Sequence, residues 1–196
     1  MRTEKPNEKI TELRQGVLTI GHSTHELAEF IALLQAHGVN TVADVRTIPR
    51  SRRNPQFNQE TLPPALQAAG IAYQHLPGLG GLRHARADSP NMAWRNASFR
   101  GFADYMQTDE YAENLGRLIE LIGRAHVVLM CAEAVPWRCH RSLIADSLTV
   151  YGIAVEHIMS KTHRQPHALT PWARVHGTRI TYPAEVLPAG GSNREP

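Results

Sequence analysis

The sequence predicts an α/β fold: an open, mostly parallel, Rossmann-like sheet of about five strands flanked by helices. Short apolar runs rich in Val and Ile alternate along the 196 residues with longer stretches whose apolar residues recur at helical spacing. This alternation is typical of βαβ units, in which a helix connects two parallel strands. The hydrophobic content of 42% provides enough apolar side chains for a core. The length fits one domain with short extensions.

The expected strands are short and are followed by glycines or polar residues. The run Ala-His-Val-Val-Leu-Met at 125–130 is apolar and rich in β-branched residues, as expected of a strand buried on both faces. The five expected strands cover residues 16–20, 40–45, 71–75, 125–130 and 153–158.

Helices are expected between these strands. Ser23 followed by Glu26 resembles a capping box at the start of the first helix, and Gly38 has the position of a C′ residue at its end. Pro63 and Pro64 lie early in the second helix and allow it to begin later than Asn58. The expected helices cover residues 24–37, 58–69, 99–106, 108–122 and, from 139 or 140, the stretch up to Gly152.

The chain is expected to divide into an N-terminal extension (1–15), an α/β domain (16–160) and a C-terminal tail (161–196). The tail is rich in Pro, His and Thr. We expect it to cover the site or to add a small β hairpin, with residues 186–196 disordered. The loop at 82–98 has no clear period, and loops of this length are often functional or mobile.

The cellular location is expected to be the cytoplasm, without membrane contact. The first fifteen residues contain no apolar stretch of the kind found in signal peptides. The apolar runs are too short to span a bilayer. Only two cysteines are present, so no disulfide framework is implied and both thiols are expected to be reduced. The sequence does not indicate an oligomeric state.

Polar motifs follow four of the expected strands. These motifs are Gly21-His22-Ser23, Asp44-Val45-Arg46, His75 with a glycine-rich turn, and Cys131-Ala132-Glu133. Ligands of open parallel sheets bind outside the carboxyl ends of the strands. We therefore expect the four motifs to share one rim of the sheet and to form a single site.

The segment from Cys131 to Arg141 reads C-A-E-A-V-P-W-R-C-H-R and carries the most informative motif. The helix dipole, with Arg138 and Arg141, is expected to lower the pKa of Cys139. The helix N-terminus is also suited to bind an anion, with His140 as acid or base. The alternatives are a Cys131 that only fills space in the core and a His140 that only caps the helix. Zinc is not expected, because the spacing lacks the C-x₂₋₄-C pair of common zinc sites.

Arginine dominates the basic residues and clusters in one loop. Eighteen of the 21 basic residues are arginine, and four of them fall between residues 46 and 53. Arginine suits phosphate and carboxylate groups, and Phe57 at the end of the loop is a candidate for base stacking. The alternative is a solvated basic loop. Asp44 is expected to orient an Arg or His, to act as a base, or simply to pair with Arg46.

Several motifs together resemble the domain of unknown function 488 family. They are T-I-G-H-S-T (19–24), D-V-R (44–46), S-R-R-N-P-Q-F (51–57), L-G-G (79–81), F-R-G-F-A-D-Y-M (99–106) and M-C-A-E…P-W-R-C-H-R (130–141). The resemblance spans roughly residues 17–158. Gly78 departs from the family pattern, in which an acidic residue is frequent there. The resemblance implies an α/β fold and a shared polar site, and it implies no substrate.

Our first functional hypothesis is an enzyme acting on a phosphate-containing ligand such as a nucleotide or a nucleic acid, with no metal or other cofactor predicted. The alternatives are a non-catalytic nucleic-acid-binding module and a thiol-redox or metal-responsive protein that uses the two cysteines. The candidate catalytic residues are Cys131, Glu133, His140, His22 and Asp44. The candidate ligand-binding residues are Arg46, Arg52, Arg53, Ser23, Arg138, Arg141 and Cys139.

Overall fold

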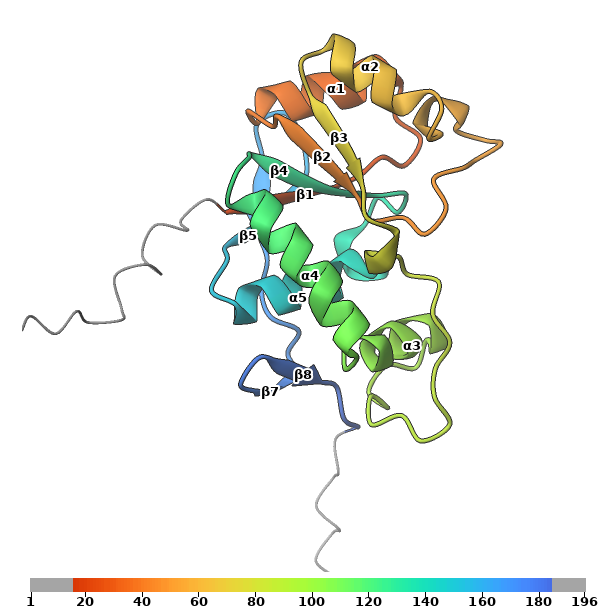
Figure 1. The fold of residues 1–196 in the computed structure, drawn as a ribbon, viewed down its shortest axis with the longest axis vertical. Helices are drawn as coiled ribbons and strands as arrows, with labels where there is room; N and C mark the ends of the chain where they lie inside the picture. The colour runs from red at the N-terminus through yellow and green to blue at the C-terminus, as the bar shows by residue number, and fades with distance from the viewer. Residues whose placement is uncertain (1–15, 185–196) are drawn as a thin grey trace, which may run out of the picture.

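The computed structural model describes residues 16–184, which form an open six-stranded sheet with helices on both faces (Figure 1). The expected extension 1–15 and the last part of the tail, 185–196, lie outside the described residues. The strand order is β3-β2-β4-β1-β5-β6, and all neighbours are parallel except β5 and β6. The strands are β1 (Val17–Gly21), β2 (Thr41–Asp44), β3 (Ala72–His75), β4 (Val127–Cys131), β5 (Val155–Ile158) and β6 (Arg164–Pro166). The prediction of an open, mostly parallel α/β sheet is confirmed.

Five helices form the two outer layers (Figure 1). Helices α1 (Leu27–Ala36) and α2 (Leu62–Ala68) pack on one face of the sheet. Helices α3 (Ala97–Tyr105), α4 (Asp109–Ile122) and α5 (Arg141–Val150) pack on the other. Short 3₁₀ turns, η1 (Pro55–Phe57), η2 (Pro77–Leu79) and η3 (Pro136–Arg138), follow β2, β3 and β4.

The central strand β4 is buried along its whole length, as its composition predicts. Because successive side chains of a strand point to opposite faces, Val128 and Met130 belong to the core under α1 and α2. Val127, Leu129 and Cys131 belong to the core under α4 and α5. The thiol of Cys131 therefore lies on the same face of the sheet as the start of α5.

The expected capping box at Ser23 is wrong. Helix α1 begins at Leu27 with Glu26 as its N-cap residue, and no side chain caps it. The chain after β1 continues to pair with the chain after β4: the backbone N–H of His22 donates to Cys131 O (2.8 Å) and that of Ser23 to Ala132 O (3.0 Å). Ser23 then turns with a φ of 46°, so the helix cannot start there.

Other helix boundaries agree better with the sequence. Thr108 caps α4 by accepting from the N–H of Tyr111, and Gly38 ends α1 with a φ of 67°. Helix α2 uses the later start that its two prolines allow, because they occupy its first turn. The side chain of Asn58 instead accepts from the N–H of Ser51.

The tail continues to pack on the domain beyond residue 160. It adds strand β6 to the sheet and then a β7 (Arg174–His176) and β8 (Arg179–Thr181) hairpin, so the expected small hairpin is confirmed. Tyr182 is fully buried, and its hydroxyl donates to Asp146 of α5 (2.8 Å). Within residues 16–184, no helix combines the length and apolarity needed to cross a bilayer.

We predict that Gly21→Ala destabilises the fold by about 2 kcal/mol or more, because a Cβ at residue 21 would overlap the backbone of Glu133 and Ala134. The matched control is Gly116→Ala in α4, where a Cβ meets open space. That change is expected to be neutral or to stabilise by about 0.5–1 kcal/mol. Urea denaturation of both variants measures the difference. Equal stability of the two variants would contradict the close approach of β1 and the loop after β4.

Candidate active site

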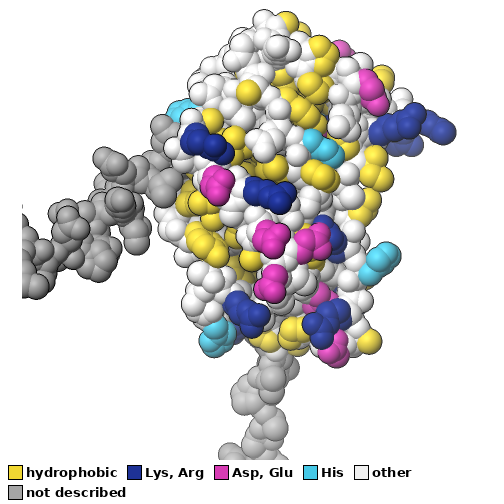
Figure 2. Space-filling view, in the orientation of Figure 1, with side chains coloured by type: hydrophobic (Ala, Val, Ile, Leu, Met, Phe, Trp, Pro, Cys, Tyr) yellow, Lys and Arg dark blue, Asp and Glu magenta, His cyan; other side chains and the backbone are white. Residues whose placement is uncertain are grey.

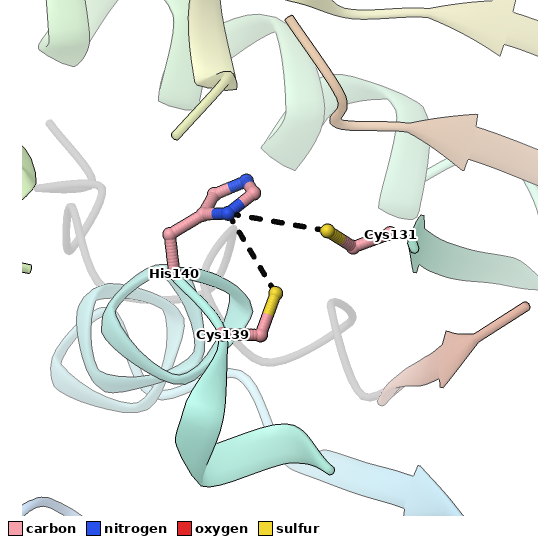
Figure 3. A group of neighbouring side chains, drawn as sticks. All are labelled: Cys131, Cys139 and His140. Carbon is pink, nitrogen blue, oxygen red and sulfur yellow. Dashed lines mark hydrogen bonds between the residues drawn. The ribbon is translucent and has the colours of Figure 1, made fainter. Parts of the chain in front are cut away.

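Two thiols and one imidazole meet where β4 ends and α5 begins (Figure 3). The Nδ1 atom of His140 lies 4.0 Å from Cys131 Sγ and 3.6 Å from Cys139 Sγ. The three atoms all lie within 4.8 Å of one another. Cys131 is the last residue of β4, Cys139 follows η3, and His140 is the N-cap residue of α5. Both cysteines are buried, and His140 is half-buried.

Two contacts fix the orientation of the His140 ring, one with the Val45 carbonyl and one with the backbone at Gly81. Its Nε2 lies 3.0 Å from the carbonyl oxygen of Val45. Since a carbonyl only accepts, Nε2 carries the proton and the neutral ring presents the lone pair of Nδ1 to the sulfur atoms. A Cβ at Gly81 would overlap the ring, so the glycine turn after β3 leaves the room that the imidazole occupies.

The two thiols differ in proton affinity because they interact with each other. The neighbouring thiol of Cys139, together with burial, raises the pKa of Cys131. The neighbouring thiol of Cys131 and the Arg141 guanidinium lower the pKa of Cys139. The lowered pKa of Cys139 and the contribution of Arg141 agree with the sequence-based expectation, whereas the second thiol is the largest cause and Arg138 is not among the main ones.

Arg141 is fully buried and holds the loop after β4 in place. Its Nη2 donates to the carbonyl oxygens of Glu133 (2.6 Å) and Ala134 (3.4 Å), and its backbone N–H donates to Cys139 Sγ (3.5 Å). Within residues 16–184 its Nε and Nη1 atoms have no hydrogen-bond partner, and no carboxylate pairs with it. Arg141 therefore serves the protein's own backbone and thiol, and it does not line the pocket described next.

A pocket of about 460 Å³ opens in front of the thiols and the imidazole. This volume lies in the range of small-molecule sites. The pocket brings together five of the candidate residues: Cys131, Glu133, Arg138, Cys139 and His140. Its remaining lining residues are Gly81, Asn96, Ser98, Phe99 and Ala132.

The other candidates at the strand ends form a separate buried network. The Arg46 guanidinium donates to the Asp44 carboxylate (Nη2 to Oδ2, 2.6 Å), to the carbonyl of Phe57 (2.8 Å) and to His22 Nε2 (3.1 Å). The Tyr73 hydroxyl also donates to Asp44, and burial together with this carboxylate raises the pKa of Tyr73. Arg46 and Asp44 thus satisfy each other, which is the structural alternative that the sequence left open.

His22 belongs to the same network and is neutral. Its Nδ1 donates to the Ser23 carbonyl (3.0 Å), so its Nε2 accepts from Arg46. Burial, with the positive charge of Arg46, lowers the pKa of His22 to about 4. The ring of Phe57 stacks on His22 with centroids 4.2 Å apart and is fully buried. Phe57 therefore packs in the core and is not available to stack on a base.

The remaining candidates, Arg52, Arg53 and Ser23, do not line the pocket. Both arginines are exposed on the loop between β2 and α2, and Ser23 occupies the turn after β1. Sequence reasoning missed Asn96 and Ser98 as lining residues. The only signal for them was the long aperiodic loop that ends at α3. It also missed that Cys131, Cys139 and His140 present their ligand atoms to one point.

The open, mostly parallel sheet defines this chain as an α/β protein, and thiol, imidazole and carboxylate groups line a pocket at the carboxyl ends of its strands. The chain belongs to the family described as Domain of unknown function DUF488, whose model matches residues 26–148. The matched range includes all ten lining residues of the pocket. Among curated proteins none matches the chain significantly, and the same is true of solved structures.

We predict that acid destabilises the fold partly through His22. Its pKa is about 4 in the folded chain and about 6.5 when unfolded. Between these values the unfolded state binds more protons, so stability falls as pH falls from about 6.5 to about 4, by up to about 1.4 kcal/mol per pH unit. His22→Gln should reduce the slope of unfolding free energy against pH in urea titrations. The control is His176→Gln on exposed β7, and equal slopes in His22→Gln and the wild type would contradict the prediction.

Proposed function

We propose that this protein is an enzyme that acts on a phosphate-containing ligand of nucleotide size in the pocket at the end of β4. The observation that carries the proposal is the composition of that single pocket: a carboxylate, an imidazole, two thiols, a guanidinium and an aromatic ring. Convergent polar groups of this kind in one concave site are typical of active sites.

Glu133 is the proposed acid and base. Its side chain is exposed in the pocket, and its Oε1 accepts from the backbone N–H of Val135 (3.2 Å). This bond orients the carboxylate, while Oε2 has no protein partner within residues 16–184 and is available to a substrate or a water molecule. The loop position of Glu133 is itself held by the bond from Arg141 to its carbonyl.

Arg138 is the proposed anion-binding residue. It is exposed at the pocket and forms no ion pair with any described residue. A guanidinium suits the bidentate binding of phosphate. The other arginines are less suited, because Arg46 and Arg141 are buried and donate to protein groups.

Phe99 and Asn96 supply the proposed contacts to the base. Phe99 is half-buried against Trp94, with ring centroids 4.9 Å apart, so its ring is held in one orientation beside the pocket. The Oδ1 atom of Asn96 caps α3 by accepting from Ser98 and Phe99, which leaves its Nδ2 hydrogens for a ligand acceptor. Two free thiols at this site fit a reducing compartment such as the cytoplasm.

The second candidate function is non-catalytic binding of nucleic acid through the loop between β2 and α2. This loop exposes Arg50, Arg52 and Arg53, and in Figure 2 Lys and Arg side chains protrude at the upper right, where the loop runs in Figure 1. Such a surface predicts binding that weakens steeply with salt, because phosphate counterions are released. Salt-dependent binding of short DNA or RNA without turnover would favour this candidate over the enzyme.

We predict that Glu133→Gln lowers turnover by at least about 100-fold and leaves binding within a few fold, since the amide keeps the shape but cannot take up a proton. The probes are inorganic phosphate and the four common ribonucleoside monophosphates. Chromatography measures turnover, and calorimetry measures binding. Wild-type turnover in this variant would remove Glu133 from the mechanism.

We predict that Arg138→Gln weakens binding of the same nucleotides by about 10-fold or more, because the charge-assisted hydrogen bonds from the guanidinium to phosphate are lost. The control is Arg124→Gln. Arg124 is also exposed but precedes β4, at the opposite end of the strand from the pocket. An equal effect of the two substitutions would show that only overall charge matters.

A further inference from the structure

We infer that Cys131, Cys139 and His140 bind a zinc ion whose open coordination position faces the pocket. This inference deepens the proposed function, since it names a metal cofactor for the same pocket. It rests on the arrangement of the three side chains, a feature that the spacing in the sequence did not indicate.

The distances fit a common tetrahedral ion. With Zn–S of about 2.3 Å and Zn–N of about 2.0–2.1 Å, a thiolate sulfur and an imidazole nitrogen on one zinc lie about 3.6 Å apart. The observed separations from His140 Nδ1 are 3.6 Å to Cys139 Sγ and 4.0 Å to Cys131 Sγ. Thiolates and imidazole are the ligands that zinc prefers in proteins.

The surroundings of the three ligands are those of a metal site. The Nε2–H of His140 donates to the Val45 carbonyl, which turns Nδ1 toward the sulfur atoms. Metal-binding histidines nearly always have such a partner on the second ring nitrogen. The backbone N–H of Arg141 points to Cys139 Sγ (3.5 Å), a contact that favours the thiolate form. Two thiolates would also balance the double charge of the ion.

The coordination would be open on the pocket side. Cys131, Cys139 and His140 all line the pocket, and within residues 16–184 no fourth His, Cys, Asp or Glu joins the group. Structural zinc sites have four protein ligands, whereas catalytic sites have three and bind water in the fourth position. The group therefore has the ligand number of a catalytic site.

An ion at this position, with the Glu133 carboxylate in the same pocket, would suit hydrolysis. Zinc lowers the pKa of a bound water, and the Glu133 carboxylate in the same pocket would take up the proton. The resulting hydroxide forms a bond to the electrophilic carbon or phosphorus of the substrate. The bond to the leaving group then breaks, and Glu133 returns the proton to that group. Two thiolates, one imidazole and a glutamate that is not a ligand also form the site of nucleobase deaminases, in which water attacks a ring carbon.

The test is metal binding by the full chain under reducing conditions. Metal-free protein is titrated with Zn²⁺ and, separately, with Co²⁺ as a spectroscopic probe. We expect one ion per chain, and with Co²⁺ a thiolate-to-metal charge-transfer band and the visible bands of a tetrahedral site. Because the chain has only two cysteines, a charge-transfer band from two thiolates identifies this site without any substitution.

Zinc binding by variants distinguishes the proposed metal ligands from Glu133, the proposed acid and base. Cys139→Ser and His140→Asn should each weaken zinc binding by at least about 100-fold, while Glu133→Gln should bind zinc like the wild type. Circular dichroism checks that each variant is folded. If a variant does not fold, the cobalt spectrum of the wild type alone decides whether the two thiolates bind the metal. Stoichiometric zinc with the expected spectrum supports the site even if no nucleotide is turned over, and that result would count against the proposed substrate alone.

Three results would overturn the inference. The first is no binding of Zn²⁺ or Co²⁺ at micromolar concentrations. The second is nucleotide turnover that persists in metal-free protein, which would retain the proposed function and remove the zinc. The third is a Cys131–Cys139 disulfide that forms and opens reversibly in protein without metal affinity, which would assign the thiols to redox chemistry.

Discussion

The arrangement of the site depends on the buried guanidinium of Arg141. A charged group without a carboxylate partner is costly in a protein interior, and within residues 16–184 only the Nη2 atom of this guanidinium finds hydrogen-bond acceptors. Here Nη2 holds the carbonyls of Glu133 and Ala134, and the backbone N–H of the same residue contacts Cys139. One residue thus connects the loop after β4, a thiol and the start of α5. Gly21 on β1 completes the arrangement by leaving room for this loop.

The strand ends carry two layers of polar groups with different roles. The inner layer contains Asp44, Arg46, His22 and Tyr73, which satisfy one another and are closed off by the stacked ring of Phe57. The outer layer is the pocket, where Glu133 and Arg138 are exposed and free to contact a ligand. The inner layer supports the outer one through Val45, whose carbonyl orients His140. Two sets of similar residues at one sheet edge therefore divide into a buried network of mutually satisfied groups and the exposed lining of a pocket.

Much of the fold follows from the sequence because it depends on local pattern. The buried run at 125–130, the stripe of α4 with its Thr108 cap and the glycine after α1 are all found where expected. The rim location of the site also follows, since parallel strands bring their ends together. What failed was decided by contacts between distant segments. Ser23 pairs with the chain after β4 and so caps no helix, and Phe57 packs on His22.

Among the site residues, too, local pattern predicted some features, and contacts between distant segments decided the others. Cys131, Glu133, Arg138, Cys139 and His140 were found by their clustering in one segment, and the pocket unites them. Whether Arg46 faces a ligand or a carboxylate could not be read from composition, because both outcomes require the same residue at the same strand end. The proximity of the two thiols to the imidazole could not be predicted for another reason. Cys131 ends a strand, Cys139 and His140 lie at the start of a helix, and the distance between them depends on the fold of the intervening loop.

The junction at Cys139 and His140 has a wider consequence. Consecutive side chains point about 100° apart in a helix and to opposite sides in a strand. Here Cys139 is extended (φ −134°, ψ 147°) and His140 is helical (φ −56°, ψ −15°), and the change of conformation between them turns both side chains toward one point. The position of this group of side chains is therefore set by the point at which the backbone changes from extended at Cys139 to helical at His140. One more helical residue at the start of α5 would give Cys139 helical dihedral angles and turn its side chain away from the ring of His140.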